Sequence, residues 1–405
     1  QKPYVDRMVQ LVTLTVAEAL ERKGRFVPRL VASIDAICAM KSWVLPAHDG
    51  QEANNFFGKE YHVDLFSSEV ASHLAHTVNL LGDELPPETV RKIRRTCERL
   101  VFAPLRRAYA LLDGEGRFPE GVWAGHHGWM CGSSNWNAVC HDNVVEAALG
   151  LLEDPRDRAL VVANALRGIS YYARGGFEAD GYCTEGMGYW NYGFGHLLTM
   201  GLTLRDLTDG RIDVFAEPKF RKAAEYAFGY QLERGVSPAF ADGNGAPSAV
   251  NLALVRRAWP DLTCAAAESV SPFGGRSDNV AGLSADTYVS LLGFGKMTPA
   301  TGVKDPKLPL RTVFPDGQVW LMRAGVAMKD AEIAAVCETD RRGLDFAANE
   351  IKEKTGKMPK KTTDMRTLLD DPEIDAILCE VPDHWHAPAA WMAMNAGKHI
   401  YVEKP

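Results

Sequence analysis

Two short segments of the chain gather the residue types that bind and process sugars. One runs from His126 to Asn137, and the other runs from Asp180 to Tyr192. Each mixes Trp or Tyr with Asn, His or Glu, so flat rings can cover sugar faces while polar tips reach hydroxyl groups. Both segments lie where a loop is expected to enter a helix, which lets their side chains face one end of a helical domain. The pattern indicates a carbohydrate cleft.

The last residues of the chain carry chemistry of another kind. His399–Val402 reads as a buried strand followed by the polar run Glu403-Lys404-Pro405, and Glu332–Cys337 reads as another apolar strand that ends in acids. Such strands are typical of a dinucleotide-binding fold. In such a fold a glycine-rich turn binds the pyrophosphate of the dinucleotide. This turn should lie about 20 residues before the acidic residue that binds the ribose. The nearest Gly-x-Gly runs begin at Gly293 and Gly243, much too far before the acids that follow Cys337, and each lacks the third glycine.

The elements that must position the sugar-type residues are helices. Apolar residues recur at three- and four-residue spacing up to about Trp259. The predicted helices are Val5–Glu21, Val27–Trp43, Val63–Leu81, Pro87–Leu112, Asn137–Leu152, Arg156–Ala173, Tyr189–Leu207, Lys219–Glu233 and Ser248–Trp259. Paired helices over about 300 residues favour an α/α barrel or incomplete toroid. A solenoid is the rival, but it would show internal similarity every 30 to 50 residues, and the sequence shows none.

Beyond Leu308 the pattern changes to strands. Leu310–Arg323 alternates around a Pro-Asp-Gly turn, which predicts a hairpin. A strand–helix order then follows, with expected elements at Glu332–Cys337, Arg341–Thr355, Met365–Leu369, Ala376–Val381, Ala387–Asn395 and His399–Val402. This order predicts a parallel, doubly wound sheet. We therefore expect a mainly α chain with an α/α toroid over 1–308, a hairpin junction over 309–328 and a partial α/β Rossmann-like unit over 329–405.

Composition excludes several classes of protein. The chain has 405 residues and a net charge of −7, which disfavours nucleic acid and anionic membrane as partners. It has no run of 18 apolar residues, so no transmembrane helix is predicted. Its eight cysteines are scattered without a Cys-x-x-Cys pair, so we expect neither a metal centre nor a disulfide framework.

Residues from about 30 to 325 resemble the heparinase II/III-type and alginate-lyase-type families. The resemblance is carried by Trp43–His48, by Asn135-Trp136-Asn137 and by the polar residues between Asp180 and Tyr192; Phe314–Arg323 resembles the start of the β-sandwich that follows the toroid in those families. The resemblance implies a lyase that cleaves an acidic, uronate-containing polysaccharide by β-elimination without a cofactor.

The same resemblance implies roles for individual residues. Asn135 would neutralise the uronate carboxylate, and Tyr189 would act as acid and base. Further candidates are Tyr192, His127, His141 and Glu185. The families also draw a histidine from the sandwich, but no histidine occurs between His196 and His384, so the expected lyase lacks one part of its site. The structural alternatives are a helix N-cap for Asn135 and core packing for the tyrosines and histidines.

Residues from about 329 to 405 resemble the N-terminal Rossmann domain of the glucose–fructose oxidoreductase/inositol dehydrogenase (Gfo/Idh/MocA) family. Ala331–Asp340, Leu369–Ala376, Pro382–His386 and Ala396–Pro405 carry this resemblance. It implies an NAD(P) cofactor whose ribose is held by Glu338. It also places the Pro382–His386 loop beside the nicotinamide, and Glu403 and Lys404 at the site, with Lys404 polarising the reacting alcohol or carbonyl.

These observations rank three functions. The leading expectation is the polysaccharide lyase, impaired by loss of the sandwich and located in the periplasm or outside the cell. The alternative is an NAD(P)-dependent sugar oxidoreductase, for which a cytoplasmic location is expected. The third is a non-catalytic carbohydrate-binding protein, or a fusion joined near Gly325–Lys329. The sequence leaves the polysaccharide and the oligomeric state open.

Overall fold

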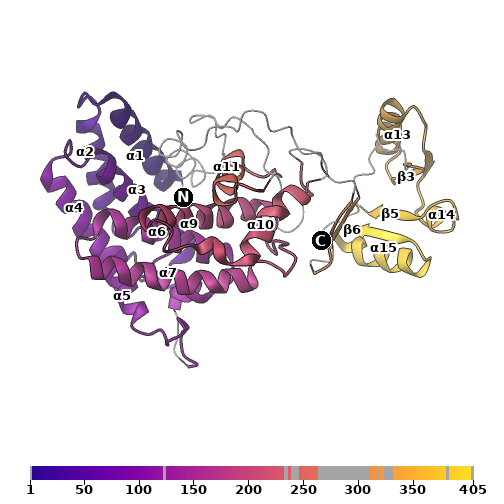
Figure 1. Ribbon diagram of the computed structural model, residues 1–405. Coiled ribbons are helices and arrows are strands. Elements are labelled where there is room, and N and C mark those ends of the chain that lie inside the picture. Colours follow the sequence, from indigo (N-terminus) through magenta and orange to yellow (C-terminus); the bar gives the residue numbers. More distant parts are fainter. Residues whose placement is uncertain are drawn as a thin grey trace. The chain divides into compact units, whose positions relative to one another are not determined.

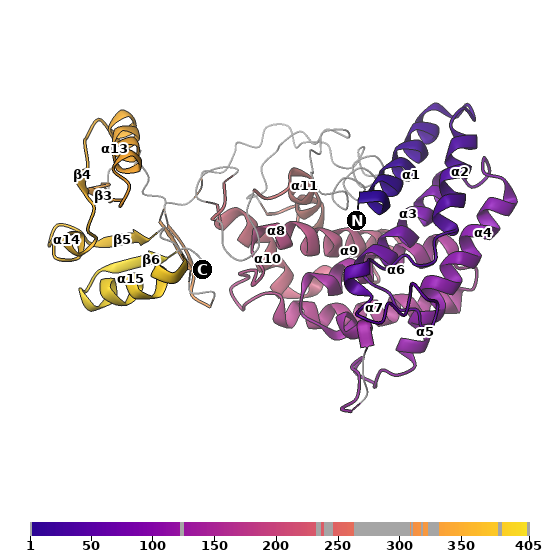
Figure 2. The same cartoon turned by 180° about the vertical axis from the view of Figure 1, so that it is seen from behind.

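The computed structural model describes residues 2–121, 125–231, 236–238, 246–262, 308, 311–316, 319–322, 332–379 and 383–402. The chain divides into two compact units. The first consists of Gln1–Phe228 and Pro247–Pro306, and the second consists of Gly229–Ala246 and Lys307–Pro405. Figures 1 and 2 show the elements of both units from opposite sides.

The first unit is built from helices. Those described are α1 (Lys2–Glu21), α2 (Val27–Cys38), η1 (Pro46–His48), α3 (Leu65–Leu81), α4 (Pro87–Cys97), η2 (Glu98–Phe102), α5 (Ala103–Tyr109), η3 (Gly125–Cys131), α6 (Asn135–Leu151), α7 (Pro155–Gly175), α8 (Met187–Tyr189), η4 (Trp190–Phe194), α9 (Gly195–Leu207), η5 (Val214–Ala216), α10 (Pro218–Gly229) and α11 (Ala249–Ala258). Each predicted helix has a counterpart here, and α4–η2–α5 and α8–η4–α9 are runs interrupted by a π-helical turn.

Helix α6 lies at the centre of this unit, packed against α3, α7 and α9. Its buried side chains lie on most of its surface, including the polar Asn137, His141 and Asp142. A helix covered on most sides belongs to the core rather than to a surface stripe. Polar residues inside it must therefore find partners on the neighbouring helices.

Side chains cap several of these helices. Asp64 accepts a hydrogen bond from the backbone N–H of Ser67, whose hydroxyl in turn accepts from the N–H of Asp64, which completes a capping box at the start of α3. Asp154 caps α7, and Pro155 fits the first helical position because it lacks the N–H that would stay unpaired there. Caps of this kind explain why, apart from α1, the predicted starts in this unit agree with the observed ones to within two residues.

The first unit is helical as expected, and an incomplete α/α toroid stays a prediction for it. Among the helices that the structure describes, none is both long and apolar enough to cross a membrane.

The second unit contains the six described strands. β1 (Arg311–Phe314) and β2 (Val319–Met322) form the predicted antiparallel hairpin, with Arg311 opposite Met322. β3 (Ala335–Cys337), α13 (Arg341–Thr355) and β4 (Lys360–Thr362) form a β-α-β unit with parallel strands. After α14 (Arg366–Leu369), a second parallel unit follows from β5 (Ala376–Cys379), α15 (Asp383–Asn395) and β6 (His399–Val402).

Helix α13 has the end signals that its sequence suggests. The Asp340 side chain accepts from the N–H of Arg342 at the first turn, and Gly356 takes a left-handed conformation with φ of 76° after the last turn. Helix α15 differs from the prediction, because it begins at Asp383 rather than Ala387 and continues through Pro388. That proline removes one backbone hydrogen bond near the start of the helix without ending it.

The parallel strands pair as β3–β4 and β5–β6, and no hydrogen bonds join the two pairs among the residues described. In the doubly wound order 3-2-1-4-5-6, the first strand lies between the second and the fourth. If β3 and β4 are the second and third strands of this order, and β5 and β6 are the fourth and fifth, then the two pairs flank the position of the first strand. The pairing thus agrees with a partial Rossmann unit whose first strand is not among the described elements.

Candidate functional site

The start of helix α6 brings two predicted site residues together. Asn135 is the first residue of α6 and is buried. Its backbone N–H donates to Oε2 of Glu185 at 2.7 Å, and its Nδ2 donates to Oε1 at 2.9 Å. The carboxylate therefore sits at the positive end of a helix, where negative charge is stabilised. Ser134, not Asn135, holds the N-cap position, and its side chain makes no capping hydrogen bond.

The helical run that carries both predicted tyrosines passes against this point. A Cβ on Gly193 would lie 2.7 Å from Oη of Tyr172 and 2.8 Å from Cβ of Asn135, so only glycine allows this approach. Tyr189, in α8, is half-buried, and Tyr192, in η4, packs edge-on against His196 with ring centroids 5.3 Å apart. Burial raises the pKa of Tyr192 well above its usual value, with Glu69 adding to the effect, so its phenol is protonated.

His141 lies inside the protein. Its Nε2 is 3.2 Å from the carbonyl oxygen of Met130, and its ring meets the edge of Trp129. Burial lowers its pKa to about 4, so the ring is neutral and Nε2 donates to that carbonyl. The geometry is that of a core histidine that ties η3 to α6.

Buried acid–imidazole pairs connect α3, α6 and α9, and the sequence interpretation missed them. The pairs are Glu69–His73 at 3.2 Å, Glu146–His76 at 3.0 Å and Asp142–His196 at 2.7 Å. Within α3, the i, i+4 spacing of Glu69 and His73 was a readable signal. The other two pairs join different helices, so local spacing could not show them.

The two acids on α6 have opposite pKa shifts. Burial raises the pKa of Asp142 to about 7, and the nearby Glu146 carboxylate adds to this. Burial acts in the same direction on Glu146, but its contact with His76 outweighs burial and lowers its pKa to about 2. The pKa values of His76 and His196 are raised by their acid partners, against the effect of burial. The contacts thus favour the ionised forms of Glu146, His76 and His196, whereas burial favours the protonated form of Asp142.

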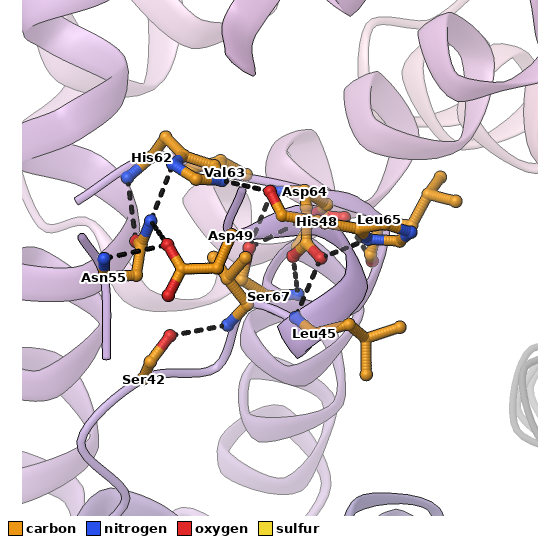
Figure 3. A network of polar contacts seen from close by, with 12 residues as sticks. Ser42, Leu45, His48, Asp49, Asn55, His62, Val63, Asp64, Leu65 and Ser67 are labelled. Carbon is orange, nitrogen blue, oxygen red and sulfur yellow. Dashed lines mark hydrogen bonds and ion pairs between the residues drawn. The ribbon is translucent and has the colours of Figure 1, made fainter. Parts of the chain in front are cut away.

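A polar network orders the loop before α3 (Figure 3). Asp49 accepts from the backbone N–H groups of Asn55 and Phe56 at 2.8 and 2.9 Å, and Asn55 Nδ2 lies 2.6 Å from Nδ1 of His62. Burial would raise the pKa of Asp49, but these donors outweigh it and the pKa is lowered. Nδ1 of His48 lies 2.7 Å from Oδ2 of Asp64, which joins the loop to the start of α3.

His127 connects this loop to η3. The backbone N–H of Val63 donates to its Nε2 at 3.1 Å, while Nε1 of Trp129 donates to the carbonyl oxygen of Val63 at 2.8 Å. His127 also lines a cavity of about 110 Å³, together with His62 and His126. Of the predicted lyase residues, His127 alone is among those lining this cavity. The predicted convergence of Asn135 and Tyr189 on one cavity mouth stays a prediction.

In the second unit, Glu338 follows directly after β3, at its carboxyl end. Its Oε1 accepts from the backbone N–H of Asp340 at 3.0 Å and from Oγ1 of Thr339 at 3.1 Å. These donors lower its pKa, so the exposed carboxylate is ionised at neutral pH. In open parallel sheets, ligands bind beyond the carboxyl ends of the strands, which is where this side chain lies.

The other predicted cofactor residues lie near the start of α15 and the end of the chain. His386 is buried in the first turns of α15, and neither ring nitrogen has a hydrogen-bond partner within the part of the chain that the structure describes. Pro382, Glu403 and Lys404 lie outside the described residues. No group of three or more His, Cys, Asp or Glu is placed to hold a metal ion in the described ranges.

Comparison with known proteins identifies the second unit. Residues 319–405 match the Gfo/Idh/MocA family, an oxidoreductase family with an NAD-binding Rossmann fold. Over 82 residues, 19% of the chain, it is 34% identical to a glycosyl hydrolase family 109 protein of Shewanella baltica. The identity is 33% to proteins of the same description from Shewanella sp. ANA-3 and Shewanella putrefaciens. The match spans 18% of the length of these relatives.

These findings correct the leading functional expectation. The expectation of a polysaccharide lyase is wrong, because the matches are to an NAD-binding oxidoreductase family and to relatives described as glycosyl hydrolases. The resemblance of the C-terminal residues to the Gfo/Idh/MocA family is confirmed for 319–405, and the chain is mainly helical with a small Rossmann-like domain. The misreading arose because aromatic and amide side chains at helix starts serve packing and capping as well as sugar binding.

Proposed function

We propose that the C-terminal unit is the nucleotide-binding part of an NAD-dependent oxidoreductase that acts on a sugar. One observation carries the proposal: within a segment that matches an NAD-binding family, an ionised carboxylate, Glu338, stands at the carboxyl end of a parallel strand. A bound nicotinamide would supply hydride transfer, which protein side chains do not provide.

Glu338 is suited to hold the adenosine ribose. An ionised carboxylate has only acceptor sites, and a ribose diol offers two hydroxyl donors. The hydrogen bonds from Asp340 and Thr339 fix one carboxylate oxygen, Oε1, and leave Oε2 for the ligand. Because the same charge would repel a 2′-phosphate, we propose NAD rather than NADP as the preferred nucleotide.

The pyrophosphate end of the nucleotide fits the chain less well. The turn that receives it should lie about 20 residues before Glu338, which falls near the β1–β2 hairpin. The sequence there holds Gly317 and Gly325 but no Gly-x-Gly-x-x-Gly run. An antiparallel hairpin also differs from the strand–turn–helix that such a turn requires. We therefore assign the adenosine end to this chain and derive no step at the pyrophosphate.

The proposal that the substrate is a sugar is based on the descriptions of the relatives. They are described as members of a glycosyl hydrolase family, and the alternative drawn from the sequence was also a sugar enzyme. The shared feature is a carbohydrate substrate. Because the match covers 18% of the length of these relatives, the whole enzyme's reaction and substrate remain proposals for this chain.

The test is a titration of the full chain with NADH, followed by the fluorescence of the bound nicotinamide. We expect saturable binding that weakens at least about tenfold in Glu338→Gln, since loss of one charge-assisted hydrogen bond costs about 1.5–3 kcal/mol. Glu353→Gln, an exposed change within α13, is the matched control and should bind as the parent does. Equal binding by Glu338→Gln and the parent, or no saturation at millimolar NADH, would disprove the proposal.

A further inference from the structure

A cavity is lined by residues of the first, helical unit, whereas Glu338 belongs to the second unit. It has a volume of about 110 Å³, which equals that of three to four water molecules in the liquid. Its apolar lining residues include Pro104, Leu111 and Phe118. Its polar lining residues are Asn54, Glu60, Tyr61, three histidines and Arg107, which is the cation among them. A lining that combines apolar surface with a guanidinium group suits a ligand with an apolar body and an anionic head.

His127 presents a hydrogen-bond donor at this cavity. Because its Nε2 accepts from the N–H of Val63, the proton of the neutral ring is on Nδ1. Burial lowers the pKa of His127 to about 3, and His62 adds to the effect, so the ring is neutral at physiological pH. Among the residues that the structure describes, the one hydrogen bond of the His127 side chain is at Nε2, so Nδ1 has no partner there. It is free to donate to a ligand.

Arg107 supplies the charge. It is exposed at the cavity, and within the described ranges it forms neither an ion pair nor a hydrogen bond. Its neighbour Arg106, in contrast, pairs with Glu98 and Asp157. Arg107 and His127 both line the cavity, and the charge of Arg107 contributes to the lowered pKa of the His127 ring.

The remaining imidazoles form a fixed wall rather than further binding groups. His62 uses Nδ1 toward Asn55 and Nε2 toward the carbonyl oxygen of His48, so both of its nitrogens are engaged (Figure 3). His126 stacks on its face, with ring centroids 3.9 Å apart. The network around Asp49 and Asn55 therefore holds this wall in place before any ligand arrives.

We propose that this cavity binds a small organic monocarboxylate, with its carboxylate between Arg107 and Nδ1 of His127 and its short carbon chain against Pro104, Leu111 and Phe118. The guanidinium group is the usual partner of a carboxylate because its donors match the two oxygens. The neutral His127 adds a directed donor without a second charge. The apolar wall limits the ligand to a short aliphatic body.

Butyrate is the probe, and butyramide is its neutral counterpart of nearly equal shape. The full chain is titrated with each while the ring resonances of its histidines are followed by NMR. We expect a saturable shift of the His127 resonance with butyrate at millimolar concentration, and binding of butyramide at least about tenfold weaker, because the amide lacks the charge that Arg107 recognises.

Two variants test the assignment. Arg107→Gln removes the cation at an exposed position and should weaken butyrate at least about tenfold, while the thermal midpoint stays within a few degrees of the parent. Arg106→Gln, which changes the adjacent arginine outside the cavity lining, should leave butyrate binding unchanged. Equal binding of butyrate and butyramide, equal binding by Arg107→Gln and the parent, or no saturable shift below about 100 mM would overturn the proposal.

Discussion

Glu185 accepts hydrogen bonds from both the backbone and the side-chain N–H of Asn135, so the two predicted site residues are partners of each other. The amide of Asn135 is committed to this carboxylate at the start of α6. Its Oδ1 is buried and has no hydrogen-bond partner within the described ranges. The pair joins the loop before α8 to the central helix of the first unit, which is a structural role that its sequence spacing did not reveal.

Replacing Glu185 with Gln should destabilise the first unit. The change keeps the shape but removes the negative charge at the N-terminus of α6, and we expect a loss of about 1–2 kcal/mol in the free energy of unfolding. Urea unfolding followed by circular dichroism measures this. Glu120→Gln, at an exposed loop position, is the control and should be neutral. An equal midpoint for Glu185→Gln and the parent would show that the cap contributes nothing.

A methyl group at Gly168 should be poorly tolerated. A Cβ there would lie 1.9 Å from Nε2 of His141 and 2.6 Å from the carbonyl oxygen of Met130, so α7 or η3 must move. We expect Gly168→Ala to lower the free energy of unfolding by about 1–3 kcal/mol, or more if the His141 hydrogen bond breaks. A Cβ at Gly128 would have no other atom within 4 Å, so Gly128→Ala serves as the control. Thermal unfolding of both variants measures the difference. Equal midpoints for the two would contradict the close packing of Gly168 against His141.

The stability of the first unit should depend on pH through Asp142. Its folded pKa is raised to about 7, against about 3.9 in the unfolded chain. Between these values the folded state binds more protons, so the free energy of unfolding falls as the pH rises, by at most about 1.4 kcal/mol per pH unit. The raised pKa values of His76 and His196 continue this fall above their unfolded value of about 6.5. The lowered pKa of Glu146 has the opposite effect on the free energy of unfolding. The stability that Glu146 contributes is lost as the pH falls below about 4.3 toward 2.

Urea midpoints at pH 5, 6, 7 and 8 for the parent and Asp142→Asn test this dependence. The parent should lose stability relative to the variant between pH 5 and 7, since Asn does not titrate. Asp83→Asn, a change at an exposed position, is the control and should follow the parent at every pH. Parallel curves for the parent and Asp142→Asn would mean that Asp142 titrates like an ordinary surface acid.

The identity of the residue after β3 should set nucleotide preference. Glu338→Ser removes the carboxylate that opposes a 2′-phosphate, and Arg341 and Arg342 follow three and four residues later as exposed cations. We expect the ratio of NADPH to NADH affinity to rise at least about tenfold in this variant. Fluorescence titrations with both nucleotides measure the ratio. A ratio that does not change would place the ribose away from β3.

Much of the local structure could be predicted from the sequence. Helical periodicity identified α2, α4 and α7, because burial of one face imposes a 3.6-residue period, and the Pro-Asp-Gly turn identified the β1–β2 hairpin. Strand β4 was missed, since Lys360-Lys361-Thr362 has no apolar run and pairs with β3 through its backbone.

The candidate sites were harder to predict, because their partners are far apart in the chain. Glu185 meets Asn135 across 50 residues, and His127 meets Val63 across 64. Residue type suggested chemistry at Asn135 and His141, but a type that can bind a sugar can also fill a core. Glu338 was singled out through the family resemblance and its place after an apolar strand, and its role at the ribose stays a prediction.

The three acid–imidazole pairs, one within α3 and two that join α6 to α3 and α9, also restrict which mutations this protein can accept over generations. Replacing one partner leaves the other as an unpaired group in the interior, which costs much stability. Replacing both partners by apolar groups costs much less. Substitutions there should therefore arise as linked changes, and a library of single mutants would misjudge which combinations are viable.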